Sequence, residues 1–107
     1  MGILTPMTNR QRSDKHEKIV ATRLGGKVTR GSGNSIEKGD VRVHGKFRVE
    51  CKTTKANSYR LEQEILLKIM SEATAAGETG ILNIQFETTG KRFVILSEDD
   101  WEEINGA

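Results

Sequence analysis

The sequence predicts an α/β fold, a mixed β-sheet flanked by helices in the order α-β-β-β-α-β-β. Three observations support this prediction. Apolar residues recur at helical spacing in residues 14–26 and 57–77. Apolar and polar residues alternate in "DVRVHGKFRVECKTT", residues 40–54. Two further apolar runs, residues 80–87 and 91–98, flank a short turn. The 107 residues are expected to form a single domain with one modest core.

The N-terminal segment is expected to precede the first helix. Residues 1–12 are interpreted as a flexible basic arm, in which Arg10 and Arg12 could contact a phosphate backbone. Ser13 is a plausible N-cap, with an acidic residue directly after it. The pair Gly25-Gly26 is expected to end this helix, because glycine readily adopts the left-handed conformation found there.

A carboxylate lies on the apolar stripe of the first predicted helix. The stripe consists of Val20, Ala21 and Leu24, and Glu17 precedes them by three, four and seven residues. An inward carboxylate needs a partner or a metal ion. The alternative, which we weight more heavily from this stripe alone, is a partly exposed glutamate at its edge. His16, the neighbouring residue, is expected to be exposed.

The central segment predicts three strands. "KVTR", residues 27–30, is a short strand, and residues 31–39 form a polar loop. Residues 40–54 read as two strands that turn near His44-Gly45. On the second of these strands, Glu50 and Lys52 share one face, and Cys51 points to the opposite face as a small core residue.

The C-terminal part predicts a helix, a hairpin and a final helical turn. Asn57 or Ser58 could cap the long helix, and Gly77 could close it. Its core stripe comprises Leu61, Ile65, Leu66, Ile69, Met70 and Ala73. The segment "TTG", residues 88–90, is a plausible turn between the last two strands. "DDWEEI", residues 99–104, is expected to form an acidic helical turn.

The charge of the chain is unevenly distributed. Residues 1–60 hold 14 Lys and Arg against 5 Asp and Glu, and residues 61–107 hold 3 against 10. This division suggests that the first half faces a polyanion. The single cysteine cannot form an internal disulfide, and no apolar run approaches the ~18 residues of a membrane span. We therefore expect a cytoplasmic protein that does not contact a membrane.

The residue types on the central strands suit metal-dependent phosphodiester hydrolysis. Asp40 and Glu50, on adjacent strands, could converge on one Mg²⁺, which prefers oxygen ligands. The backbone carbonyl of Cys51 could reach the same ion, and Glu17 could add a further ligand. Lys52 could position the attacking water or stabilise charge on the phosphoryl group.

This pattern resembles the PD-(D/E)XK nuclease superfamily. Nine residues separate Asp40 from "ECK", residues 50–52, although Gly39 stands where the superfamily name has Pro. The chain is most similar to the small Holliday-junction resolvases of archaea and some phages. These share an early helical glutamate, here Glu17, and an Arg-Gly-Ser or similar loop, here residues 30–32, over about residues 13–98.

The resemblance implies a restriction-endonuclease-like core, dependence on Mg²⁺ with Mn²⁺ as a substitute, a homodimer, and cleavage of branched DNA. Glu17, Asp40, Glu50 and Lys52 would be the catalytic residues. The family includes phage proteins, so a phage origin is compatible with an intracellular location. The expected DNA contacts, chosen from the basic residues and from the loop that leads to Asp40, are Arg10, Arg12, Arg23, Arg30, Ser32, Lys38 and Lys55.

Other interpretations remain open on the sequence alone. The chain could be another DNA nuclease that acts on nicks, flaps or duplex. It could be a DNA-binding module that shares the fold without turnover, or a structural protein whose charged strand face is only solvated. A structural zinc site is not favoured, because two histidines and one cysteine cannot fill it without carboxylates.

Overall fold

The computed structural model describes residues 6–29 and 40–106, which form three helices and a five-stranded sheet. The elements, in chain order, are α1 (Asn9–Leu24), β1 (Lys27–Val28), β2 (Val41–Val43), β3 (Phe47–Thr54), α2 (Gln63–Ala75), β4 (Thr79–Phe86), β5 (Lys91–Ile95) and α3 (Glu98–Ile104). This order agrees with the prediction, with α3 in place of the expected acidic turn. No helix within the described residues is long and apolar enough to cross a membrane.

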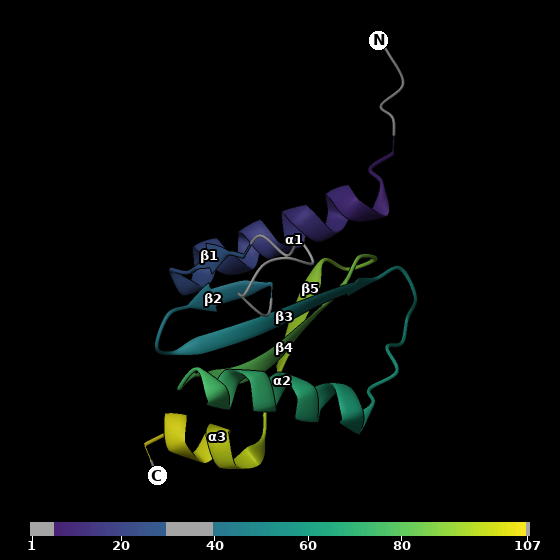
Figure 1. Ribbon diagram of the computed structural model, residues 1–107. Coiled ribbons are helices and arrows are strands. Elements are labelled where there is room, and N and C mark those ends of the chain that lie inside the picture. Colours follow the sequence, from purple (N-terminus) through teal and green to yellow (C-terminus); the bar gives the residue numbers. More distant parts are fainter. Residues whose placement is uncertain (1–5, 30–39, 107) are drawn as a thin grey trace.

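The sheet is mixed, as predicted. Its strands lie in the order β1-β2-β3-β4-β5, so β3 is central. The central pair β3–β4 is parallel, and every other neighbouring pair is antiparallel. Helix α2 provides the crossover that a parallel pair requires. Figure 1 shows α1 on one face of the sheet and α2 on the other, with α3 on the α2 side.

Helix α1 begins earlier than the sequence suggested. Its N-cap is Thr8, whose hydroxyl accepts the backbone N–H of Gln11, while the Gln11 side chain accepts the Thr8 backbone N–H. This reciprocal pair satisfies two otherwise unpaired backbone donors, so the expected cap at Ser13 is wrong. Residues 9–12 are therefore helical, so the predicted arm is wrong for them, and residues 1–5 lie outside the described residues. The helix ends as predicted at Gly25, whose φ is 70°.

Helix α2 begins later than the sequence suggested. Its N-cap is Glu62 rather than Asn57 or Ser58, and that cap has no side-chain hydrogen bond. The crossover has only to return the chain along the sheet. Thirteen helical residues span ~20 Å of the ~26 Å length of the eight-residue strand β3, and residues 55–62 form the non-helical part of the connection. Before the helix starts, Tyr59 packs against the core as part of the connection.

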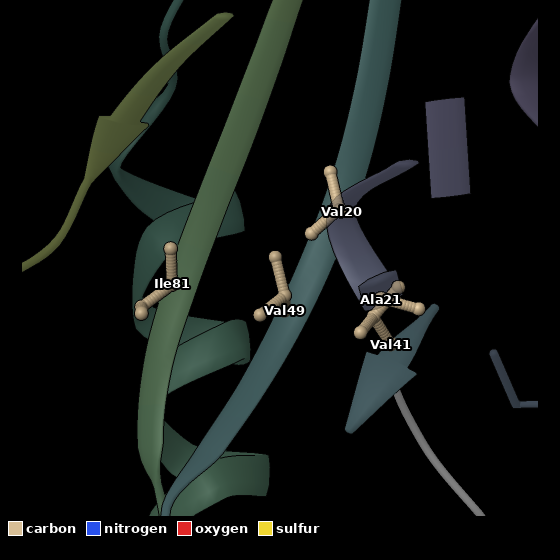
Figure 2. Packing of buried hydrophobic residues seen from close by; sticks show 5 residues of the cluster. All are labelled: Val20, Ala21, Val41, Val49 and Ile81. Atoms are coloured by element: carbon tan, nitrogen blue, oxygen red, sulfur yellow. The ribbon is translucent and has the colours of Figure 1, made fainter. Parts of the chain in front are cut away.

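The core on the α1 face is small and aliphatic. Val20 and Ala21 of α1 pack against Val41 of β2, Val49 of β3 and Ile81 of β4, as Figure 2 shows. Cys51 is partly buried and packs against this cluster, as predicted from its strand position. The predicted stripe of α1 is thus confirmed for its two buried members, whereas Leu24 is exposed.

A second apolar cluster lies on the α2 face. Ile69 packs on Leu82 and Ile84 of β4, with Ile65, Leu66 and Ile95 around them. The helix approaches β4 closely at Gly80. A Cβ placed there would lie 2.9 Å from the Ile69 carbonyl oxygen, so only glycine permits this contact without a shift.

A buried ion network holds the turn between β2 and β3. Glu78, whose side chain is 0% exposed, accepts hydrogen bonds from Arg42 at 2.7 and 3.2 Å, from Arg48 at 3.2 Å and from the Gly45 N–H at 2.9 Å. Arg42 and Arg48 are cross-strand partners, so the carboxylate separates two like charges. Burial alone raises the pKa of Glu78, but these hydrogen bonds outweigh it and the net pKa is lowered. The network therefore lies at the hairpin end of β3.

Candidate active site

Asp40 lies where β2 separates from β3. The β2–β3 register ends at the pair Val41–Val49, and Asp40 directly precedes β2. The Asp40 N–H donates to the Val49 carbonyl at 2.9 Å, and the carboxylate accepts the Cys51 N–H at 2.8 Å. The Asp40 side chain therefore replaces the backbone partner that β3 loses at this point.

The same geometry orients a backbone oxygen. In a strand, the N–H and C=O of one residue point to the same side. Because the Cys51 N–H points to Asp40, its carbonyl also points to that side of β3, beyond the last residue pair of β2 and β3. Burial raises the pKa of the Cys51 thiol, and Asp40, Glu17 and Glu50 raise it further. The thiol is therefore not a nucleophile here, which agrees with its predicted structural role.

Glu50 and Lys52 project from the other face of β3, toward α2. The Lys52 ammonium lies 3.7 Å from the Glu50 carboxylate, and their side chains are 43% and 29% exposed. The pKa of Glu50 is raised, first by burial and then by the negative charge of Asp40, while Lys52 acts against this shift. The prediction that these two residues share one face is confirmed. Both remain accessible at the open edge of β3.

Glu17 approaches from α1, on the opposite side of the sheet. It is partly buried, and its pKa is raised to about 7, first by burial and then by Asp40, Asp14 and Glu50. A carboxylate under this combined repulsion is stabilised by a proton or a cation. Glu17 is thus intermediate between the two predicted positions, an exposed glutamate at the edge of the stripe and a fully buried one, because its side chain is partly buried.

These groups carry the oxygen ligands that a hard divalent cation prefers. The carboxylates of Asp40 and Glu50 and the Cys51 carbonyl supply three oxygens along the edge of β3, with Glu17 nearby. Within residues 6–29 and 40–106, no group of three or more His, Cys, Asp or Glu side chains is placed to hold a metal ion. Two carboxylates and a carbonyl are nevertheless an ordinary partial set for Mg²⁺, which keeps several water ligands.

The predicted DNA contacts divide into three groups. Arg10, Arg23 and Lys55 are exposed, so they are available to bind phosphates. Arg12 is instead paired with Glu87 at 2.9 Å and also bonds Met7 and Asn9, so it joins α1 to the end of β4. Arg30, Ser32 and Lys38 lie outside the described residues.

The prediction that His16 is exposed is wrong. This histidine is 1% exposed, and its Nε2 lies 2.7 Å from the Asn83 side-chain oxygen. Its Nδ1 is buried without a hydrogen-bond partner among the described residues. Burial lowers the pKa of His16, although the Asn83 contact opposes this shift. The face of α1 that covers the sheet therefore includes a polar residue next to Glu17. Helical periodicity alone could not show this, because the partner lies 67 residues away.

Two residues of α2 also face the candidate site. Lys68 and Glu72 line a cavity together with Glu50 and Lys52. The sequence gives a weak signal for them, since they are four residues apart and therefore share a helix face. Nothing in the sequence alone indicates which strand that face covers.

Comparison with known proteins does not assign the chain to a family. No family model matches the chain, and no curated protein matches it. The functional interpretation therefore depends on the geometry described above.

Proposed function

We propose that this protein is a Mg²⁺-dependent DNA endonuclease with a restriction-endonuclease-like core, and that its substrate is a four-way junction. The observation that carries the proposal is the position of Asp40. It directly precedes β2, and its carboxylate accepts the N–H of Cys51, the residue between Glu50 and Lys52. Its charge also raises the pKa of Glu50. The Asp40 carboxylate is thus bound to the strand that carries the Glu50–Lys52 pair, an arrangement that a solvated sheet face does not require.

Asp40, Glu50 and the Cys51 carbonyl would hold the Mg²⁺, and Mn²⁺ would substitute. Bound there, the cation polarises a phosphodiester oxygen and lowers the pKa of a coordinated water. Lys52 would donate to the attacking water or to the phosphoryl oxygen that gains charge. Glu17 would complete the site from α1, since its raised pKa reports a carboxylate that lacks a positive partner.

The basic residues supply binding without reading the sequence of the DNA. Arg10, Arg23 and Lys55 are exposed and belong to the basic half of the chain. Contacts of this kind bind phosphates and position the substrate, and their affinity falls with salt. Phosphate contacts of this kind suit recognition of DNA shape rather than of base sequence. The preference for junctions over flaps, nicks or duplex rests on the family resemblance.

Paired cuts on a two-fold symmetric junction require two sites. One chain carries one set of Asp40, Glu50 and Lys52, so we propose a homodimer with an isologous interface. Exposed apolar side chains in the acidic half are the candidate surface, including Leu67 of α2 and Phe93 and Val94 of β5. Sedimentation across micromolar concentrations tests this. A strict monomer that still makes paired symmetric cuts would contradict the dimer.

The test of activity compares labelled four-way junction, flap and duplex DNA with Mg²⁺, with Mn²⁺ and without metal. We expect metal-dependent cleavage of the junction, and its loss in Glu50→Gln with DNA binding retained. Asp40→Asn should behave in the same way, because the basic side chains that hold the phosphates are unchanged. Cleavage at the wild-type rate by Glu50→Gln in Mg²⁺ would remove Glu50 from the site. Binding of all three DNAs without cleavage would favour a non-catalytic DNA-binding module.

A further inference from the structure

A charged cavity lies between β3 and α2. It has a volume of about 150 Å³ and is lined by Glu50, Lys52, Ile65, Lys68, Ile69 and Glu72. The strand and the helix each contribute one lysine and one glutamate. The two isoleucines of the lining also belong to α2; Ile69 is part of the core and Ile65 packs against it.

The two helix residues lie across this cavity from the strand. Lys68 and Glu72 of α2 line it together with Glu50 and Lys52 of β3, and the Lys52 ammonium lies 3.7 Å from the Glu50 carboxylate. The spacing of four residues keeps Lys68 and Glu72 on one helix face.

We propose that this cavity is a phosphate-binding subsite, in which Lys52 from β3 and Lys68 from α2 hold one phosphate group from two sides. The proposal rests on the proposed function in one respect. A cation held by Asp40 and Glu50 occupies the Glu50 carboxylate, which is now 3.7 Å from Lys52. Two ammonium groups then face one remaining carboxylate, Glu72, and the cavity favours an anion.

Glu72 has the opposite effect in this arrangement. Its carboxylate repels an anion in the cavity and therefore weakens phosphate binding. The same repulsion limits how tightly the product phosphate is held. Substitutions at the two helix positions should therefore change affinity in opposite directions. For a phosphate subsite, loss of the Lys68 charge weakens binding and loss of the Glu72 charge strengthens it. For a cation site, both effects would be reversed.

The experiment measures binding of a fluorescein-labelled DNA duplex by anisotropy, in Ca²⁺ and in EDTA, over a range of salt concentrations. In Ca²⁺, we expect Lys68→Ala to weaken binding by roughly 5- to 10-fold and to reduce the salt slope by about 1, as the loss of one phosphate contact predicts. Glu72→Gln should tighten binding by roughly 2- to 5-fold. Alanine and glutamine are both good helix formers, so neither change should disturb α2.

The matched control is Lys46→Ala. Lys46 is an exposed lysine in the β2–β3 turn, at the far end of β3 and ~20 Å from Lys52 by strand rise. Its substitution should leave the affinity within about twofold of wild type, because it is remote from the cavity. An unchanged affinity and salt slope in Lys68→Ala would overturn the proposal. So would weaker binding in Glu72→Gln together with tighter binding in Lys68→Ala.

A second probe separates this proposal from the proposed function. Inorganic phosphate is titrated into the isotopically labelled protein in Mg²⁺, and amide shifts of α2 and β3 are followed by NMR. If the protein cleaves no DNA but binds phosphate in a manner that Lys68→Ala abolishes, the subsite stands and the nuclease proposal fails. If the protein cleaves DNA and Lys68→Ala changes neither cleavage nor phosphate shifts, the nuclease proposal stands and the subsite fails.

Discussion

Replacing Glu17 with glutamine should stabilise the protein in alkaline, metal-free buffer. The pKa of Glu17 rises from 4.5 to about 7 in the folded state, because burial and three nearby carboxylates disfavour its charge. The folded state therefore binds this proton more tightly than the unfolded state does. The resulting cost to stability is absent well below pH 4.5, grows as the pH rises and is complete above pH 7. Glutamine removes that charge with little change in shape.

The size of the effect follows from the pKa shift. About 2.5 units at 1.36 kcal/mol each give an upper limit of roughly 3.4 kcal/mol. Glu17 is only partly buried, so solvent screening reduces this to roughly 2 kcal/mol at pH 8.5. At pH 5 the gain should fall to roughly 0.8 kcal/mol, because the folded state still keeps this proton whereas the unfolded state, with a pKa of 4.5, is already mostly ionised.

The assay is urea denaturation of wild type and Glu17→Gln at pH 5 and pH 8.5 in EDTA. Glu102→Gln, an exposed position on α3, is the control and should change stability at neither pH. An equal effect of Glu17→Gln at both pH values, or a loss of stability at pH 8.5, would refute the electrostatic reasoning. Added Mg²⁺ should stabilise wild type more than Glu17→Gln at pH 8.5, since the cation supplies the charge that Glu17 lacks.

Three further predictions concern other parts of the molecule. Lys52→Ala should reduce single-turnover cleavage at least ~100-fold while Mn²⁺ binding, followed by calorimetry, is retained; unchanged cleavage would remove Lys52 from the chemistry. Glu78→Gln should lower the unfolding free energy by ~3 kcal/mol in urea denaturation, because Arg42 and Arg48 lose their buried partner. Since the pKa of Glu78 is lowered, wild type should lose this stabilisation as the pH falls below 4.5, whereas Glu78→Gln should show a flatter acid profile there. Gly80→Ala should lower the free energy of unfolding by ~1–3 kcal/mol, because its Cβ would lie 2.9 Å from the Ile69 carbonyl oxygen. An unfolding temperature equal to that of wild type would show that α2 can shift away from residue 80 at little cost.

Local sequence patterns predicted the types of element well and their ends poorly. The alternation in residues 40–54 defined a hairpin and the shared face of Glu50 and Lys52, because side chains on a strand alternate with a period of two. The start of α1 was misplaced, since Thr8 and Gln11 make a better cap than Ser13. The start of α2 was misplaced because the length of a crossover depends on the strands that it connects.

Local patterns were enough to place Glu50 and Lys52 on one face of a strand, Asp40 next to the strand before it, and Glu17 on the apolar side of a helix. What these residues contact depended on the packing of distant segments. Asp40 bonds the Cys51 N–H of β3, and the crossover brings Lys68 and Glu72 of α2 to the cavity that Glu50 lines. The packing also buries His16 against Asn83. Periodicity fixes which way a side chain points from its own element, but contacts between distant segments depend on packing that no local pattern encodes.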